Sequence, residues 1–142
     1  GLTYAGTLAS LTSTNTLLNA IVNATFRCTS TSTGPVIGIS GGGACYVADG
    51  AGGYVVGTGG SAVSGFGTTI ADYVDLALDS GGAAWDLNLL RAGGLVADSF
   101  TAAFVDIKVG EIQNQTREPG SLALLGLSVA GLAMSRRRKL GA

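Results

Sequence analysis

The sequence predicts an all-β body, a β-sandwich or a jelly-roll-like fold with one short helical turn, followed by a C-terminal apolar α-helix. Three observations predict it. Short stretches of the body alternate apolar and polar residues with a period of two. Thirteen of the 24 glycines lie between Gly34 and Gly67, where turns are expected to be densest. An apolar run without charges precedes four consecutive cations near the end of the chain.

The first half of the body supplies most of the expected strands. Residues 2–11 are expected to form the first strand. Residues 18–28 show the clearest alternation, and the positions expected on one face are Leu18, Ala20, Val22, Ala24, Phe26 and Cys28. Residues 35–40 and 44–48 flank a glycine triplet and predict a hairpin. Residues 54–57 follow a glycine-rich turn and predict the next strand.

The second half predicts two more strands and the helical turn. Residues 73–79 alternate through Val74, Leu76 and Leu78, and residues 105–112 alternate in the same way. Between them, Asp86 can cap a short helix over the sequence LNLLRA, and Gly93 can supply its left-handed end. Six or seven short strands with glycine turns are typical of a sandwich.

The two cysteines, Cys28 and Cys45, lie 17 residues apart, and this spacing is not that of a metal site. In an exported protein we expect them to form a disulfide, which would stabilise the fold by about 3 kcal/mol in the chain-entropy model. The alternative is a pair of reduced, buried cysteines in a cytosolic protein.

Charge is divided unevenly along the chain. Residues 1–118 contain four basic residues and nine carboxylates, a net charge of −5, whereas the tail carries +4. An acidic body without a basic stripe argues against a nucleic-acid partner, because binding to phosphates requires clustered Lys and Arg. The chain contains no histidine, which excludes Ser-His-Asp and Cys-His catalysis. We therefore expect no enzymatic activity, no metal and no cofactor.

A few side chains are candidates for binding. Asp75 and Asp79 share a face of the expected strand and could contact a weakly bound Ca²⁺ or form a glycosidase-like pair, although a solvated outer face is the more common role of such carboxylates. Trp85 and the tyrosines could form a sugar-stacking surface, although a single tryptophan beside a short helix more often packs in a core.

The tail carries the most specific signal. Its apolar segment spans roughly 13 to 16 residues, fewer than the about 20 expected of a permanent transmembrane helix. A short apolar segment followed by cations suits a sorting signal that is held in the bilayer and then removed, and the positive-inside rule leaves the body outside the cytoplasm. A cytosolic amphipathic tail fits poorly, because the segment has no polar face. Met134 is the only methionine, so we expect a form whose signal peptide has been removed.

The stretch EPGSLALLGLSVAGLAMSRRRK resembles the PEP-CTERM sorting signal of Gram-negative, exopolysaccharide-producing bacteria. That signal has a Pro-Glu-Pro start, an apolar helix rich in Leu, Gly and Ala, and an Arg-rich end. Arg117 replaces the first proline. Residues 85–112 also resemble the region that precedes the signal in many such proteins. The residues that match the motif itself are Glu118, Pro119, Arg136, Arg137, Arg138 and Lys139.

The resemblance implies an exported domain, residues 1–116, and a sorting tail, residues 117–142. Within the tail we expect the motif at 117–121, the apolar helix at 122–135 and the basic end at 136–139. The resemblance also implies export, transient anchoring in the inner membrane, processing by the membrane protease exosortase, and delivery to the cell surface or extracellular matrix.

For the body we expect a structural or adhesive role in the surface or biofilm matrix. A composition rich in Gly, Thr and Ala with few charges suits self-association through strand edges, which could build filaments. The alternative is a module that binds the exopolysaccharide.

Overall fold

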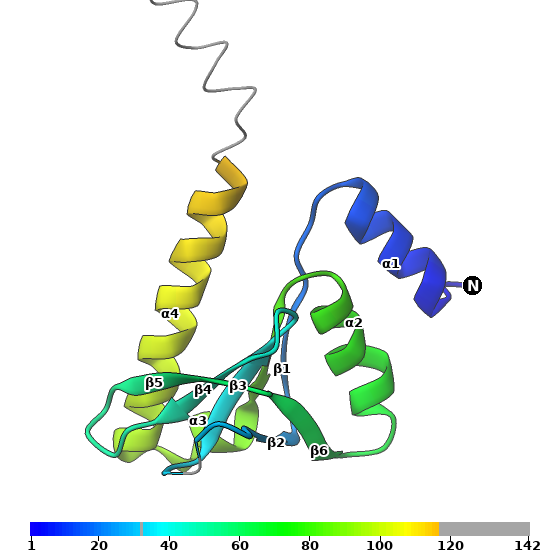
Figure 1. The fold of residues 1–142 in the computed structure, drawn as a ribbon. Helices are drawn as coiled ribbons and strands as arrows, with labels where there is room; N and C mark the ends of the chain where they lie inside the picture. Colours follow the sequence, from blue (N-terminus) through cyan, green and yellow to red (C-terminus); the bar gives the residue numbers. More distant parts are fainter. Residues whose placement is uncertain (32, 117–142) are drawn as a thin grey trace, which may run out of the picture. The chain divides into compact units, whose positions relative to one another are not determined.

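The computed structural model describes residues 1–31 and 33–116. The chain divides into two units, residues 1–105 and 106–142. The first unit holds all the described strands and the start of the last described helix (Figure 1). The described helices are α1 (Tyr4–Ser13), the π-helix η1 (Ile70–Val74), α2 (Asp75–Asp79), α3 (Leu87–Ala92) and α4 (Gly94–Thr116).

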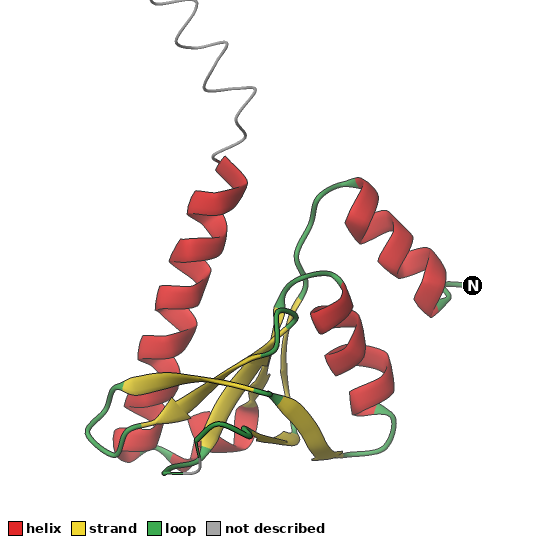
Figure 2. Ribbon diagram, in the orientation of Figure 1, coloured by secondary structure: helices red, strands yellow, loops and turns green. Residues whose placement is uncertain are grey.

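In residues 1–31 and 33–116, seven strands form two sheets (Figure 2). The larger sheet has the order β1-β7-β3-β4-β5, in which β1 and β7 are parallel and the other pairs are antiparallel. The smaller sheet is an antiparallel ribbon of β2 and β6. The strands are β1 (Asn19–Val22), β2 (Ala24–Arg27), β3 (Val36–Ser40), β4 (Ala44–Ala48), β5 (Tyr54–Thr58), β6 (Ser61–Gly65) and β7 (Ala83–Asp86).

The larger sheet is covered on both faces. On one face, Trp85 of β7 packs against Tyr46 of β4 and against Phe100 and Phe104 of α4. On the other face, a buried cluster joins the sheet to the ribbon and to η1 through Ala24, Phe26, Ile39, Cys45, Val74 and Ala84. The core therefore has two parts that share the central strands β3, β4 and β7.

Several expected strands are confirmed. The hairpin of β3 and β4 and the following strand β5 form as predicted, in antiparallel register. The expected strand over 18–28 divides at Asn23 into β1 and β2, with Ala20, Ala24 and Phe26 buried as the alternation requires. The predicted helical turn is also confirmed, because the Asp86 side chain accepts a hydrogen bond from Asn88 N and Gly93 ends α3 with φ of 72°.

Three expected strands are wrong. Residues 2–11 lie mostly in α1, which Thr3 caps by accepting a hydrogen bond from Gly6 N. Residues 73–79 lie in η1 and α2, where Val74, Leu76 and Ala77 are buried. Burial of the adjacent residues Leu76 and Ala77 does not fit the alternation of a half-buried strand. Residues 105–112 belong to α4, whose Phe100 and Ala103 face the core.

The fold class is therefore corrected in part. The expectation of several strands in two sheets is confirmed, but the expectation of a single helical turn is wrong. A helix rather than a second full sheet covers the tryptophan face, and the second sheet has only two strands. The predicted apolar helix at 122–135 lies outside the described residues, and the domain boundary after residue 116 stays a prediction.

Candidate functional site

Cys28 and Cys45 form the predicted disulfide, with their Cα atoms 5.7 Å apart. Cys45 lies fully buried on β4, and Cys28 follows directly after β2. The bond therefore ties the end of the ribbon to the centre of the larger sheet.

Trp85 is fully buried, and this overturns the idea that it is a sugar-stacking platform. Its ring lies parallel to that of Tyr46, with a centroid distance of 5.3 Å, while Phe100 and Phe104 meet it edge-on. Its indole Nε1 donates a hydrogen bond of 3.4 Å to Asn19 Oδ1. No ring face is left for a ligand, so Trp85 is a core residue.

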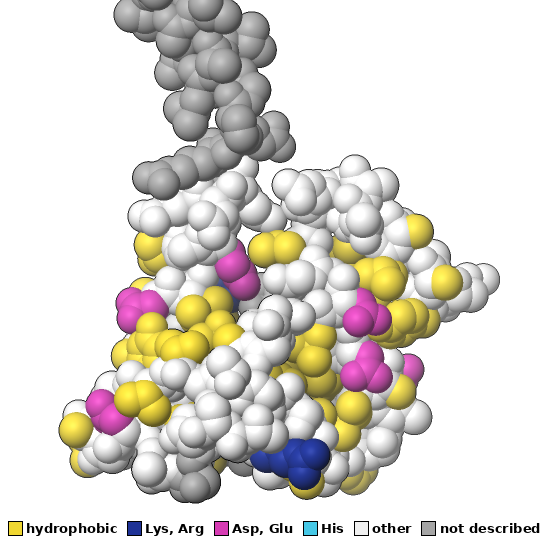
Figure 3. Space-filling model, viewed as in Figure 1, with side chains coloured by type: hydrophobic (Ala, Val, Ile, Leu, Met, Phe, Trp, Pro, Cys, Tyr) yellow, Lys and Arg dark blue, Asp and Glu magenta, His cyan; other side chains and the backbone are white. Residues whose placement is uncertain are grey.

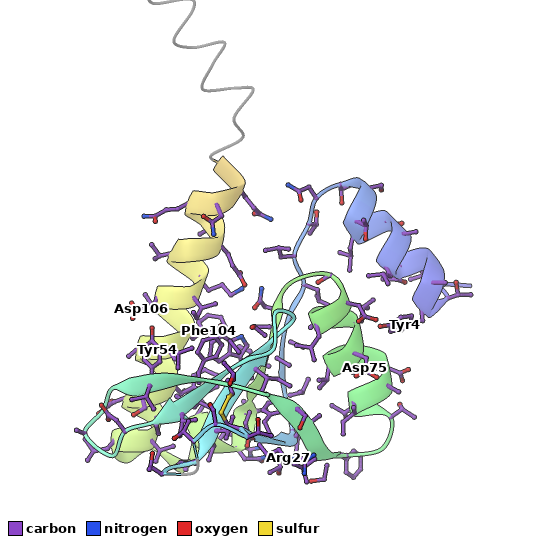
Figure 4. The ribbon with its side chains drawn as sticks, in the orientation of Figure 1. Tyr4, Arg27, Tyr54, Asp75, Phe104 and Asp106 are labelled. Atoms are coloured by element: carbon purple, nitrogen blue, oxygen red, sulfur yellow. A yellow bond between two sulfur atoms is a disulfide. The ribbon has the colours of Figure 1, made fainter. Side chains whose placement is uncertain are left out.

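Asp75 and Asp79 lie at the two ends of α2, four residues apart, and not on a strand. Tyr4 of α1 donates a hydrogen bond of 2.5 Å to Asp79 Oδ2, and Figure 4 shows Tyr4 and Asp75 on neighbouring helices. That bond, with smaller contributions from desolvation and from the charges of Asp79 and Asp75, raises the pKa of Tyr4 to about 12. Asp79 therefore serves to join α1 to α2.

Within residues 1–31 and 33–116, no group of three or more His, Cys, Asp or Glu side chains is placed to hold a metal ion. A Ca²⁺ contact at Asp75 and Asp79 stays a prediction. The same ranges contain no helix with both the length and the hydropathy needed to cross a bilayer.

A pocket of about 290 Å³ lies between β2, the segment that follows it and the start of α3. No sequence pattern predicts this pocket, because its walls come from stretches far apart in the chain: β2 with the segment that follows it, and the start of α3. Arg27 and Asp86 contribute the charged groups, and Arg27 Nε donates to Ser61 Oγ at 3.0 Å. The lining residues are Thr25, Phe26, Arg27, Cys28, Thr31, Gly34, Pro35, Val36, Asp86 and Leu89.

Asp86 is the buried carboxylate of this pocket, with only 5% of its surface exposed. Desolvation raises its pKa, although hydrogen bonds from Asn88 and Leu89 at the start of α3 act in the opposite direction. A sequence could identify Asp86 as a helix cap, but it could not show the burial.

Replacing Asp86 with Asn should make stability less dependent on pH. An acid with a raised pKa holds its proton more tightly in the folded state, so the wild type should lose stability as pH rises from about 4, the ordinary Asp pKa, through the folded-state pKa. Asn caps helices as well as Asp does and carries no charge, so Asp86→Asn should lack this decline.

Urea midpoints measured from pH 3 to pH 8 test this prediction. Asp98→Asn, which removes an exposed aspartate of α4, is the matched control and should follow the wild-type curve. A decline of the same size in Asp86→Asn and in the wild type would show that the raised pKa of Asp86 does not cause the loss of stability.

β5 is the last strand of the larger sheet and offers a candidate interaction surface. Its sequence, YVVGT, contains no charge and no proline, and Val55 and Val56 are 42% and 62% exposed. In the view of Figure 3, hydrophobic and uncharged side chains cover much of the described surface, with few basic ones. The edge therefore lacks the charges, prolines and bulges that usually prevent strands from pairing between molecules.

The edge of β5 is closed at its C-terminal end. Thr58 O accepts backbone hydrogen bonds of 3.2 Å from both Thr29 N and Ser30 N, and Thr58 N donates to Ser30 Oγ at 2.7 Å. Thr58 therefore directs its backbone groups away from β4, and by the alternation of an antiparallel strand Val56 does the same. No backbone hydrogen bond from another described segment reaches Val56.

Comparison with known proteins identifies the tail. Residues 118–139 match the family described as the PEP-CTERM protein-sorting motif. The chain thus carries a motif of the class that directs export through a C-terminal sorting signal. In particular, it carries a PEP-CTERM signal, which implies processing by an exosortase and transient association with the membrane during sorting.

The match includes Glu118, Pro119 and the basic end 136–139, all of which lie outside the described residues. Arg117 lies just before it. No curated protein and no solved structure matches the chain. The comparisons therefore classify the tail and not the body.

Proposed function

We propose that the exported body is a non-enzymatic structural or adhesive protein of the cell surface or biofilm matrix, which self-associates through the edge of β5. The observation that carries this proposal is the exposed, uncharged edge at Val55 and Val56. Strand edges of this kind pair with other strands through backbone hydrogen bonds, and a second copy supplies the same uncharged edge. Repeated association of this type could build filaments if a second surface also takes part.

Val56→Lys should weaken self-association about tenfold or more, because it places a charge on an edge where the two copies would meet. Sedimentation velocity at micromolar concentration measures the effect. Val109→Lys is the matched control, since Val109 is 47% exposed but lies on α4. A wild-type protein that remains monomeric, or two variants that associate equally well, would contradict the proposal.

Absence of enzymatic activity is part of the proposal. It is supported by the lack of histidine in the whole chain and by the use of Asp79 as a hydrogen-bond acceptor for Tyr4. Release of reducing sugars from an exopolysaccharide incubated with the purified body would overturn it.

A second candidate function is exopolysaccharide binding, and the pocket that contains Arg27 and Asp86 supports it. Pockets with an apolar lining and a few polar groups are common ligand sites. Retardation of the body on a polysaccharide gel, lost in Arg27→Ala and kept in the exposed control Arg91→Ala, would favour this candidate over self-association alone.

A further inference from the structure

The segment that follows β2, residues 28–31, occupies the C-terminal end of the β5 edge. Thr29 and Ser30 together provide three donors to Thr58 O, since Thr29 Oγ1 adds a hydrogen bond of 3.1 Å to the two from backbone N–H groups. The hydroxyl of Ser30 accepts from Thr58 N. Both backbone groups that Thr58 would offer to a partner strand are thus already bonded within the chain.

The same segment also packs on the face of β5. A side chain at position 57 would begin 2.5 Å from Cys28 Sγ, 2.7 Å from Ser30 Oγ and 2.8 Å from Thr31 Cγ2, so only glycine leaves room for the segment. Gly57 is buried for this reason, whereas its neighbours Val56 and Thr58 are exposed.

The disulfide anchors this segment at its first residue. Both sulfur atoms lie 3.5 Å from Thr58 O, and because a disulfide carries no proton these are packing contacts and not hydrogen bonds. Beyond the hydrogen bonds to Thr58 and the packing on Gly57, residues 29–31 belong to no helix or strand, and Thr29 and Ser30 are exposed. The bond between Cys28 and Cys45 is therefore a covalent link that keeps the start of this segment beside β5.

We propose that this disulfide is a redox lock on the β5 edge: while it is intact, residues 28–31 stay seated on Thr58, and its reduction releases them and lengthens the edge open to a second copy. Reduction by a dithiol breaks the S–S bond and transfers two electrons and two protons, which leaves two thiols on the protein and a disulfide on the reductant. The inference rests on the proposed self-association, because it regulates the same edge.

Hydrogen exchange of the full chain, oxidised and then reduced with dithiothreitol, tests the lock. We expect exchange of the Thr58 amide to accelerate about tenfold or more on reduction, while the amides of β3 and β4 remain protected. Equal exchange at Thr58 in the two states would overturn the proposal. Joint loss of protection at Thr58, β3 and β4 would also overturn it, because the disulfide would then support the whole sheet.

Ser30→Ala provides a variant that keeps the disulfide. It removes the acceptor of Thr58 N, so the oxidised variant should already show faster exchange at Thr58, whereas Ser64→Ala, at an exposed serine of β6, should not. Unchanged exchange in oxidised Ser30→Ala would count against the lock.

Sedimentation of the same samples separates this inference from the function on which it rests. Release of the segment together with stronger, Val56-dependent association supports both. Release of the segment without any association would support control of the edge by the disulfide and would overturn the proposed self-association. Association without release of the segment would support the self-association and would overturn control by the disulfide.

Discussion

Trp85→Ala should destabilise the body by about 3–5 kcal/mol, the usual cost of truncating a buried aromatic residue. Trp85 is fully buried and contacts three aromatic rings from β4 and α4, so its removal leaves a cavity that none of them can fill alone. Since small domains have a total stability of about 5–15 kcal/mol, the variant should be largely unfolded in low concentrations of urea.

Urea unfolding followed by far-UV circular dichroism measures this effect, because the variant retains no tryptophan for fluorescence. Phe66→Ala is the matched control: Phe66 is 79% exposed and its loss should change stability by no more than about 0.5 kcal/mol. Trp85→Phe should lie between the two. If Trp85→Ala unfolded at the wild-type midpoint, the packing on this face of the sheet would have to be different.

Deletion of residues 118–139 should abolish processing and retention at the envelope. The sorting motif lies entirely within this stretch, so the processing protease would have no signal to recognise. We expect the intact protein to yield a shortened species that ends near residues 116–119, and the deletion variant to yield one unprocessed species.

Intact mass of protein recovered from the cell envelope and from the culture matrix measures this outcome. Arg91→Gln, which alters an exposed cation of the body, is the control and should be processed normally. A full-length species ending at Ala142 in the matrix would show that the tail is retained, and identical processing of the deletion variant would place the signal elsewhere.

The parts of the fold that could be predicted from the sequence depend on local chemistry. The hairpin around Gly41–Gly43, the cap at Asp86 and the stop at Gly93 each need only a few neighbouring residues, and each forms as expected. The disulfide could be predicted because two cysteines allow only one pairing and because the tail indicates export, which favours disulfides.

The errors arise where a short apolar pattern fits two periods. Val74, Leu76 and Leu78 alternate as in a strand, but Ile70, Val74, Ala77 and Leu78 also have the i, i+4, i+7, i+8 spacing of a helix. Tertiary packing favours the helix, since Val74 joins the buried cluster beneath the larger sheet. In α4 the same ambiguity is resolved by Phe100 and Phe104, which meet Trp85.

The candidate sites depend on contacts between distant segments and could not be predicted. Tryptophan is a residue type that stacks on sugars, and only the burial of Trp85 excludes that role. The pocket at Arg27 and Asp86, and the closure of β5 by Thr29 and Ser30, join residues that lie about 30 to 60 positions apart.

The order of strands in the larger sheet has a consequence for when the body can fold. β7 comes last in the chain but lies between β1 and β3, and its parallel partner β1 lies 64 residues earlier. Long-range parallel pairing is slow, because the entropy cost of closing a long loop comes before the native contacts that offset it. A chain that emerges from a translocation channel N-terminus first can form the β3–β4–β5 meander early. The larger sheet cannot be completed until residue 86 has emerged. The body should therefore remain unfolded enough to pass through the channel for most of its translocation.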